Sequence, residues 1–168
     1  MKQNLVRVTT RNGGIKMKYF KYVVLIFLVV LVCGCSKKTT KTCTIVSDQS
    51  TNGYKDTIKY TIYAKGDTVY KLEQNEVIDS DKKDIIDFYK KEFNSMYKKY
   101  NKTYGGYTYN IDTKSNKVIL DVAIDYKKFN TKMYIEDNTG LKRYTNNKNQ
   151  FTFEGMTKMY ENLGATCK

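Results

Sequence analysis

Cysteine is the most reactive side chain in this 168-residue sequence, and its four copies form two groups. Cys33 and Cys35 are one glycine apart at the end of an apolar run, whereas Cys43 and Cys167 are far apart in the sequence. Histidine, the usual general base at neutral pH and the commonest zinc ligand, is absent. The chemistry that the residue types favour is therefore modification or oxidation of thiols.

The apolar run before the first pair of cysteines has the features of a secretory signal. Lys18 and Lys21 form a short basic start after Met17, and residues 22–33 are uninterruptedly apolar. A membrane-spanning helix needs about 20 apolar residues, so this run is too short to be an ordinary span. Its length and basic start fit the apolar core of a signal peptide.

The end of that run, Val32-Cys33-Gly34-Cys35, resembles the lipobox of bacterial lipoproteins. The resemblance implies that residues 17–34 are cleaved and that Cys35 becomes a lipid-modified N-terminus. Cys33 does not fit the modified position, because Val32 would then stand where a small residue is required. We therefore expect a chain anchored by its lipid on the extracytoplasmic face of the cell membrane. The alternative is a plain apolar anchor with incidental cysteines.

Residues 1–16 are an unusual prefix for a signal peptide. The stretch "GGIKM" can be encoded by a purine-rich tract of the kind that binds ribosomes just before a start codon. We therefore expect translation to begin at Met17, with residues 1–16 as an untranslated leader. The alternative is a long basic region at the start of the signal.

The charge of the chain indicates anionic partners. The sequence has 30 basic and 17 acidic residues, and removal of residues 1–34 leaves a net charge of +7. Such a surface favours anionic lipids or wall polymers, and on an extracytoplasmic protein we expect no nucleic acid. Residues 35–42 include "SKKTTKT" and are expected to be a lipidated polar tether. Its lysines either contact an anionic membrane surface or serve only as a solvated spacer.

The rest of the chain, residues 43–168, is expected to be a single domain. Between Tyr54 and Ile78 apolar residues alternate on both sides of "AKGD", which predicts a β-hairpin with Gly66 in the turn. Alternation over 107–125 around "TKSN" predicts a second hairpin. Residues 127–151 are polar and rich in asparagine, and their pattern predicts neither a helix nor a strand.

Two segments have the spacing of amphipathic helices. Asp79, Ser80 and Asp81 offer capping oxygens before the first, and Gly105 ends it. The second is "FTFEGMTKMYENLG", which ends at Gly164. The apolar face of the first helix consists of Ile85, Ile86, Tyr89, Phe93, Met96, Tyr97 and Tyr100.

Sites for common enzyme chemistry are not indicated. "DSDKKD" lacks the glycine and the distal glutamate of a calcium loop, and capping explains its acids. Asp121 and Asp125 lie on one strand about 13 Å apart, which is too far for a catalytic acid pair. The sequence has no G-x-S-x-G elbow, P-loop or dinucleotide-binding glycine motif. We therefore expect a protein that is not an enzyme and that uses no cofactor or metal.

The order of elements resembles the YehR-like lipoproteins, which are small bacterial lipoproteins of unknown function. The resemblance lies in "YTIYAKGDTVYK", the following amphipathic segment, "GGYTYNID" and "VAIDYKK", and spans roughly residues 54–164. It implies a compact α+β domain and no catalytic residue. The expected fold is thus an antiparallel sheet built from two β-hairpins, with two amphipathic helices on one face.

Cys43 and Cys167 depart from that resemblance and are expected to form a disulfide. Cys33 leaves with the signal peptide and Cys35 is blocked by its thioether, so two thiols remain in a compartment where disulfides persist. Domain termini are often close in space, which makes the pairing geometrically reasonable. The alternative is that both thiols stay reduced.

Tyrosine is the remaining feature that bears on function, with sixteen copies in the chain. Tyrosines on the surface of a tethered domain can contact a peptide, a glycan or a lipid, and the candidates are Tyr63, Tyr107, Tyr109 and Tyr144. The alternative is that most tyrosines pack in the core. We expect a non-catalytic binding module. The alternatives are a structural envelope component or an accessory subunit of a membrane complex, and then a secreted enzyme.

Overall fold

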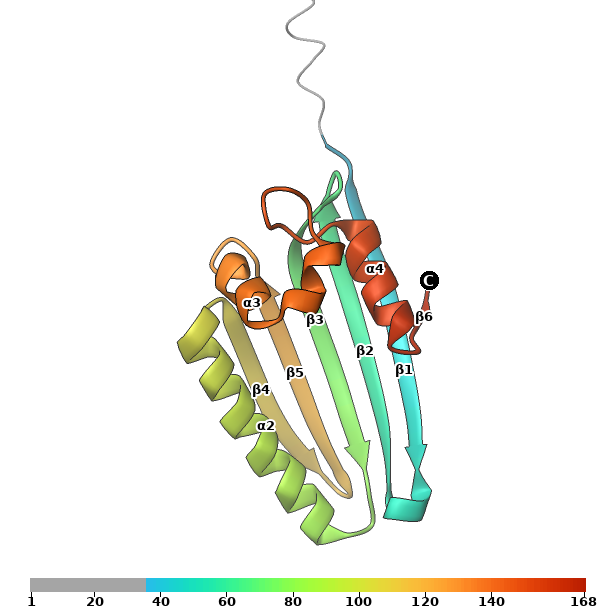
Figure 1. Cartoon of the computed structure of the whole chain (residues 1–168). Helices are drawn as coiled ribbons and strands as arrows, with labels where there is room; N and C mark the ends of the chain where they lie inside the picture. The colour runs from blue at the N-terminus through green and yellow to red at the C-terminus, as the bar shows by residue number, and fades with distance from the viewer. Residues whose placement is uncertain (1–35) are drawn as a thin grey trace, which may run out of the picture. The chain divides into compact units, whose positions relative to one another are not determined.

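A computed structural model describes residues 36–168, which form one compact unit. Its main feature is an antiparallel sheet of six strands in the order β4-β5-β3-β2-β1-β6 (Figure 1). The expected α+β class is therefore confirmed. The strands are β1 (Lys38–Gln49), β2 (Tyr54–Lys65), β3 (Thr68–Asp79), β4 (Tyr107–Lys114), β5 (Lys117–Asp125) and β6 (Thr166–Cys167).

Strands β2 and β3 form a hairpin because the residues between them permit a tight turn. Gly66 has a φ of +61°, a conformation that is costly for residues with a side chain. Along β2, Ile62 and Ala64 are fully buried on one face, while Lys59 is exposed on the other. Strands β4 and β5 form a second hairpin, in which Val118 and Leu120 are fully buried.

The first strand begins inside the segment that was expected to be a tether. Strand β1 pairs with β2 from Lys38↔Lys65 to Gln49↔Tyr54, so residues 38–42 belong to the sheet. The prediction of a tether is therefore wrong for these five residues. Their threonines are polar but β-branched, and such residues suit a strand with one solvated face.

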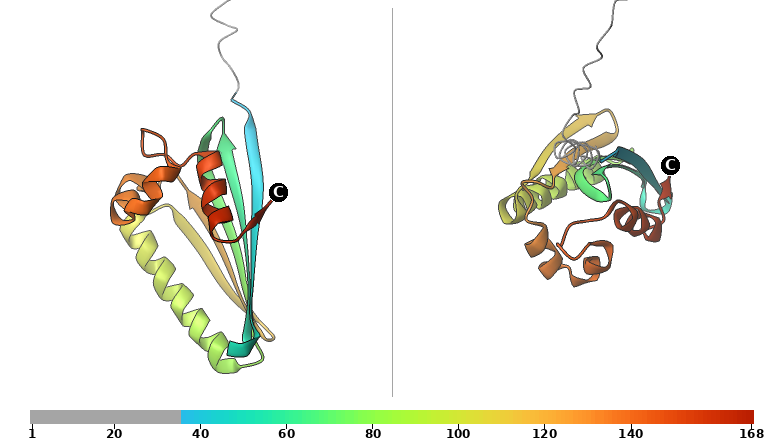
Figure 2. Two further views of the ribbon diagram at one scale, coloured as in Figure 1. Left: turned by 45° about the vertical axis from the view of Figure 1, so that its right-hand side comes forward. Right: turned by 90° about the horizontal axis from the view of Figure 1, so that it is seen from above.

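Within residues 36–168, three α-helices and two 3-10 helices accompany the sheet, so the two-helix expectation was incomplete. The α-helices α2, α3 and α4 all lie on the same side of the sheet (Figure 2). The helices are α2 (Lys83–Tyr104), α3 (Thr131–Asp137) and α4 (Phe153–Asn162), with the 3-10 helices η1 (Ser50–Asn52) and η2 (Thr139–Tyr144).

Helix α2 follows the expected face, but its N-terminus is arranged differently from the prediction. Lys82 is the N-cap and makes no side-chain capping bond. The Ser80 hydroxyl instead accepts a hydrogen bond from the Lys82 backbone N–H and donates to the Gly53 carbonyl. Ser80 is thus buried as a link between the helix start and the β1–β2 connection.

Short helices occupy the region 127–151, for which the sequence predicted no element. The Asn130 side chain caps α3 by accepting a hydrogen bond from the Met133 backbone N–H. Only Ile135 is buried within α3, and only Tyr144 within η2. One buried residue per helix leaves too little apolar periodicity to predict either helix from sequence.

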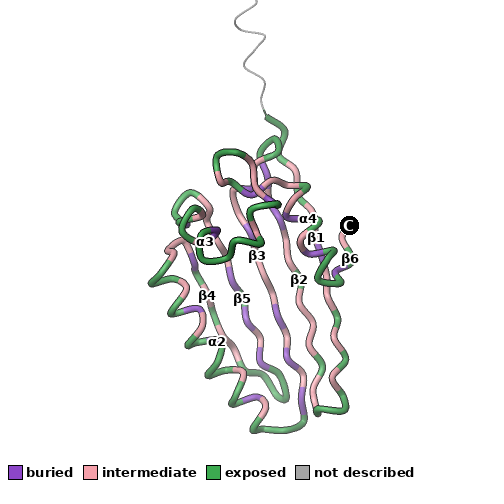
Figure 3. The backbone as a smooth tube through the Cα atoms, in the orientation of Figure 1, coloured by how far each residue is buried: buried purple, intermediate pink, exposed green. Residues whose placement is uncertain are grey.

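The core lies between the helices and one face of the sheet. One hydrophobic cluster joins β1, β2 and β3 to α4, and the other joins β3, β4 and β5 to α2. Buried segments accordingly concentrate on the central strands (Figure 3). Ile124, Tyr126 and Tyr134 pack against both clusters, so they mark the place where the two meet. The unit contains both of its clusters and has the properties of a domain that folds independently.

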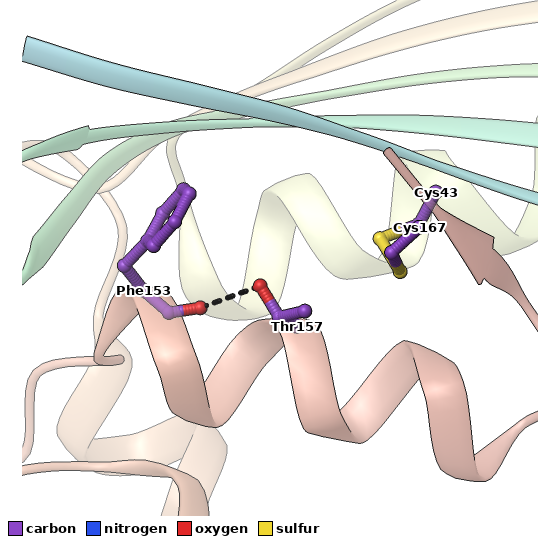
Figure 4. Close-up of a disulfide and its surroundings, with 4 residues drawn as sticks. All are labelled: Cys43, Phe153, Thr157 and Cys167. Atoms are coloured by element: carbon purple, nitrogen blue, oxygen red, sulfur yellow. Dashed lines mark hydrogen bonds between the residues drawn. A yellow bond between two sulfur atoms is a disulfide. The ribbon is translucent and has the colours of Figure 1, made fainter.

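The predicted disulfide between Cys43 and Cys167 is confirmed, and it joins β1 to β6. The two cysteines face each other in register, with Cα atoms 4.0 Å apart. Next to them, Thr42 and Lys168 exchange two backbone hydrogen bonds of 3.0 and 2.8 Å. The bond is close to α4, where the buried Thr157 hydroxyl donates to the Phe153 carbonyl over 2.8 Å (Figure 4). The disulfide thereby fixes the C-terminal strand at the edge of the sheet.

Candidate functional site

A cleft of about 780 Å³ opens over the helix-covered face of the sheet. Its lining combines residues of α2, α3 and α4, and it includes members of both hydrophobic clusters. Its volume is within the range typical of small-molecule sites. Eight tyrosines line it, and we call this opening the tyrosine cleft.

The floor of the tyrosine cleft comes from central strands. Tyr60 of β2 and Gln74 of β3 are register partners, and alternation directs both to the helix-covered face. Leu72 and Ile124 pair in the same way between β3 and β5 and supply apolar floor. The sheet register therefore determines which side chains a ligand would meet at the bottom.

The walls of the tyrosine cleft are aromatic on both sides. Tyr160 of α4 stacks on Tyr60 with ring centroids 4.0 Å apart and an angle of 20° between the rings. Opposite, the α3 residue Tyr134 packs edge-on against Tyr104 of α2 at 5.0 Å. Tyr126 contacts Phe151 edge-on at 5.6 Å between the two sides. These contacts hold the rings in place, so the cleft has a preformed shape.

The hydroxyls in the tyrosine cleft remain protonated at physiological pH. Burial, with a smaller contribution from Glu76, raises the pKa of Tyr60 to about 12. Burial also raises the pKa values of Tyr126, Tyr134 and Tyr160, and the neighbouring tyrosines raise them further. The cleft thus presents a group of neutral hydroxyls that can both donate and accept hydrogen bonds.

A chain of polar side chains extends from the cleft floor beneath α2. The Tyr97 hydroxyl donates to Gln74 Oε1 over 3.2 Å, and Gln74 Nε2 donates to Glu76 Oε2 over 2.7 Å. Glu76 is only 8% exposed, and burial, followed by the nearby Asp56, raises its pKa to about 7. Asp56 also has a raised pKa because of burial. A carboxyl that titrates near neutrality therefore lies beside the cleft floor.

The rim of the cleft carries charged and amide groups. The Arg143 guanidinium lies 4.8 Å from the centroid of the Tyr144 ring, and Asn162 donates to the Tyr144 hydroxyl over 3.0 Å. The Tyr104 hydroxyl donates to Asp137 over 2.9 Å. Charge is thus confined to the rim, and among the described residues the lining of the floor is uncharged.

The four predicted surface tyrosines do not lie together. Tyr107 and Tyr144 line the cleft but are each only 7% exposed, so the prediction that they are surface residues is wrong. Their rings are buried by Phe129 and by the aliphatic lining of the cleft. Tyr63 lies on the opposite, open face of the sheet and donates to Glu73 over 2.6 Å. Tyr109 donates to Asn94 of α2 and lies outside the cleft.

The residues that best define the cleft were missed in the sequence. Alternation already directs Tyr60 to the same face as Ile62, which was the one signal that could have identified it. Tyr126, Tyr134 and Tyr160 come together only through the positions of α3 and α4. No local pattern reports such a tertiary arrangement.

The sequence indicated no metal site and no membrane span, and it placed the lipid attachment at Cys35. Within residues 36–168, no three histidine, cysteine, aspartate or glutamate side chains are placed to hold a metal ion. No helix in the same range is both long and apolar enough to cross a membrane. Cys35, the signal peptide and residues 1–16 lie outside the described residues.

Comparison with known proteins identifies the fold alone. No family model matches the chain, and no curated protein matches it. The NMR structure of a protein from Streptococcus pneumoniae TIGR4 is similar over 100% of this chain and 94% of that chain. Its TM-score is 0.51 and its sequence identity is 12%, a level at which only the fold is shared. The resemblance to YehR-like lipoproteins therefore stays a prediction.

Proposed function

We propose that this protein is a lipid-anchored, extracytoplasmic binding module that holds a small ligand in the tyrosine cleft and does not alter it chemically. The lipobox-like sequence ending at Cys35 supports the anchor. The cleft supports binding, because its 780 Å³ are lined by apolar surface with a few polar groups.

The observation that carries the proposal is the preformed ring of tyrosines. Tyrosine offers a large rigid surface with little conformational entropy to lose, together with a hydroxyl for orientation. Here Tyr107 packs edge-on against Phe129, and Tyr126 packs edge-on against Phe151. Binding would therefore require little rearrangement of the protein, which reduces the free-energy cost of association.

The absence of histidine supports a binding role over a catalytic one. Glu76 is the group with a pKa nearest to neutrality, but Gln74 lies between it and the cleft, joined to Tyr97 on one side and Glu76 on the other. The hydroxyls that line the cleft have raised pKa values and are poor nucleophiles. The site is thus suited to holding a ligand.

Ligand screening by NMR on residues 36–168 with isotope-labelled tyrosine rings tests the proposal. A ligand should shift the ring signals of Tyr60, Tyr126, Tyr134 and Tyr160 and leave Tyr63 unchanged, because Tyr63 is on the opposite face. The ligand should be recovered chemically intact. Conversion of the ligand, or shifts confined to Tyr63 and its neighbours, would contradict the proposal.

A further inference from the structure

We propose that the ligand of the tyrosine cleft is a neutral saccharide, bound through ring stacking and through hydrogen bonds to the tyrosine hydroxyls. This inference rests on the function proposed above and adds the chemical class of the ligand. It is argued from the hydrogen-bonding groups, the ring faces and the charge of the cleft.

The first argument is the number of hydroxyls that face the cleft with spare hydrogen-bonding capacity. Within residues 36–168, one buried side-chain oxygen or nitrogen lacks a partner, and it is Asp56 Oδ1. The hydroxyls of four lining residues are not among these buried atoms although none of the side-chain hydrogen bonds described above includes them, so they keep accessible surface: Tyr60, Tyr126, Tyr134 and Tyr160. A ligand that fills this space must supply several donors and acceptors to them.

The second argument is the flat apolar surface between those hydroxyls. Besides the tyrosine rings, the lining includes the apolar side chains of Leu72, Ile124 and Met159. A sugar ring has apolar C–H faces and a rim of hydroxyls, so one molecule can satisfy both kinds of surface. The amide groups of Asn138 and Asn162 at the rim add further partners of the same kind.

The third argument is charge. The floor is uncharged, and the two charged side chains of the lining, Asp137 and Arg143, have opposite signs and lie at the rim. An ionised ligand on the floor would lose its hydration with no counter-charge beside it, which is unfavourable. A neutral ligand avoids that cost.

Lipids and extended peptides fit this geometry less well. An acyl chain would bury the tyrosine hydroxyls against hydrocarbon and leave them without partners. An extended peptide binds by adding a strand at a sheet edge. The cleft floor consists of β2, β3 and β5, which already have a neighbouring strand on each side.

The test is an array of neutral oligosaccharides, made of hexose, deoxyhexose, pentose and N-acetylhexosamine units, probed with residues 36–168. We expect binding to at least one of them. Tyr126→Phe should weaken that binding by about tenfold, since it removes one hydrogen bond and keeps the ring packed on Phe129 and Phe151. Tyr63→Phe on the open face is the matched control and should leave the affinity unchanged.

Two outcomes separate this inference from the function on which it rests. If lauric acid or an unstructured peptide binds in the cleft and no oligosaccharide does, the saccharide proposal is wrong. The proposed binding function would then still hold. If no compound of any class shifts the cleft tyrosines, both proposals are overturned. If Tyr126→Phe and Tyr63→Phe reduce the affinity for the oligosaccharide equally, it does not bind specifically in the cleft.

Discussion

At the scale of single residues, the distribution of polar groups beneath the cleft sets the properties of the site. Glu76 is nearly buried, and its one side-chain hydrogen bond comes from Gln74. Asp56 is close enough to raise its pKa, and the hydroxyls of Tyr60 and Tyr97 face the same region. Since burial disfavours the charged carboxylate, Glu76 is neutral in acid and charged above neutrality.

Glu76 should therefore make the stability of the domain depend on pH. Its pKa is about 7 in the folded state against an ordinary value of 4.5. A raised pKa gives stability that is fully present below pH 4.5 and is lost as the pH rises through 7, amounting to about 3 kcal/mol. The free energy of unfolding of the wild type, measured with urea, should fall between pH 5 and pH 8. Glu76→Gln should remove most of this fall.

The matched control for that experiment is Glu73→Gln. Glu73 lies on the open face of the sheet, and its pKa is lowered by hydrogen bonds from Lys71 and Tyr63. Its contribution therefore has the opposite sign and is small, because the side chain is 41% exposed. If wild type and Glu76→Gln lose equal stability between the two pH values, the buried carboxyl is not the cause.

At the scale of elements, the alternation of the strands was predictable and the short helices were not. Ile62, Val118 and Leu120 occupy the buried face that their spacing predicts. Strand β1 was missed over residues 38–42, because a run of threonine and lysine has no apolar alternation. Helices α3 and η2 were missed because each buries only one residue, which leaves no apolar periodicity to recognise. The sequence thus predicted the two hairpins of the sheet, but it did not predict α3, which forms one side of the cleft.

Ile62→Asp tests the orientation of strand β2. Ile62 is completely buried, so the substitution places an unpaired carboxylate in the core and should cost several kcal/mol, about 3–5. Thermal melting followed by circular dichroism measures the loss. Lys59→Asp introduces the same side chain on the exposed face and should change the melting temperature little. If Ile62→Asp melts at the wild-type temperature, Ile62 lies on the exposed face of the sheet and the orientation of β2 is wrong.

The disulfide should stabilise the domain mainly by restricting the unfolded chain, and in the folded state it joins β6 to β1. Cys43 and Cys167 are 124 residues apart, and closing so long a loop stabilises a fold by about 4–5 kcal/mol in the chain-entropy model. Denaturant unfolding with and without reductant should show a loss of that size. Exchange of the Lys168 amide should accelerate on reduction, because its bond to Thr42 is no longer anchored. Complete alkylation of both thiols without reductant would show that the bond is absent.

At the scale of the whole molecule, the proposed function combines a lipid anchor with a domain that contains the tyrosine cleft. The anchor is inferred from sequence, since Cys35 lies outside the described residues. The domain places its helices on one face of the sheet and leaves the other face polar, with Lys59, Asn75 and Asp121 on it. The cleft could not be predicted from sequence, because its walls come from four separate parts of the chain.

The anchor is tested by metabolic labelling with a fatty acid. Cys35→Ser should abolish the label and prevent release of the mature N-terminus, because the thioether forms at that sulfur. Cys33→Ala is the matched control and should remain labelled, since Cys33 leaves with the signal peptide. Labelling of the Cys35→Ser protein would contradict the anchor and leave the cleft unaffected.

Binding in the tyrosine cleft is tested by a substitution that blocks the opening of the cleft. Leu163 is 62% exposed at the cleft opening, and Val46 is 57% exposed on the opposite face of the sheet. Leu163→Trp should close the opening and Val46→Trp should not, while both variants should melt like the wild type. Calorimetric titration with a ligand found by screening should give one site per chain, retained in Val46→Trp and weakened at least tenfold in Leu163→Trp. Unchanged affinity in Leu163→Trp, or loss of binding in Val46→Trp alone, would show that the ligand does not bind in the tyrosine cleft.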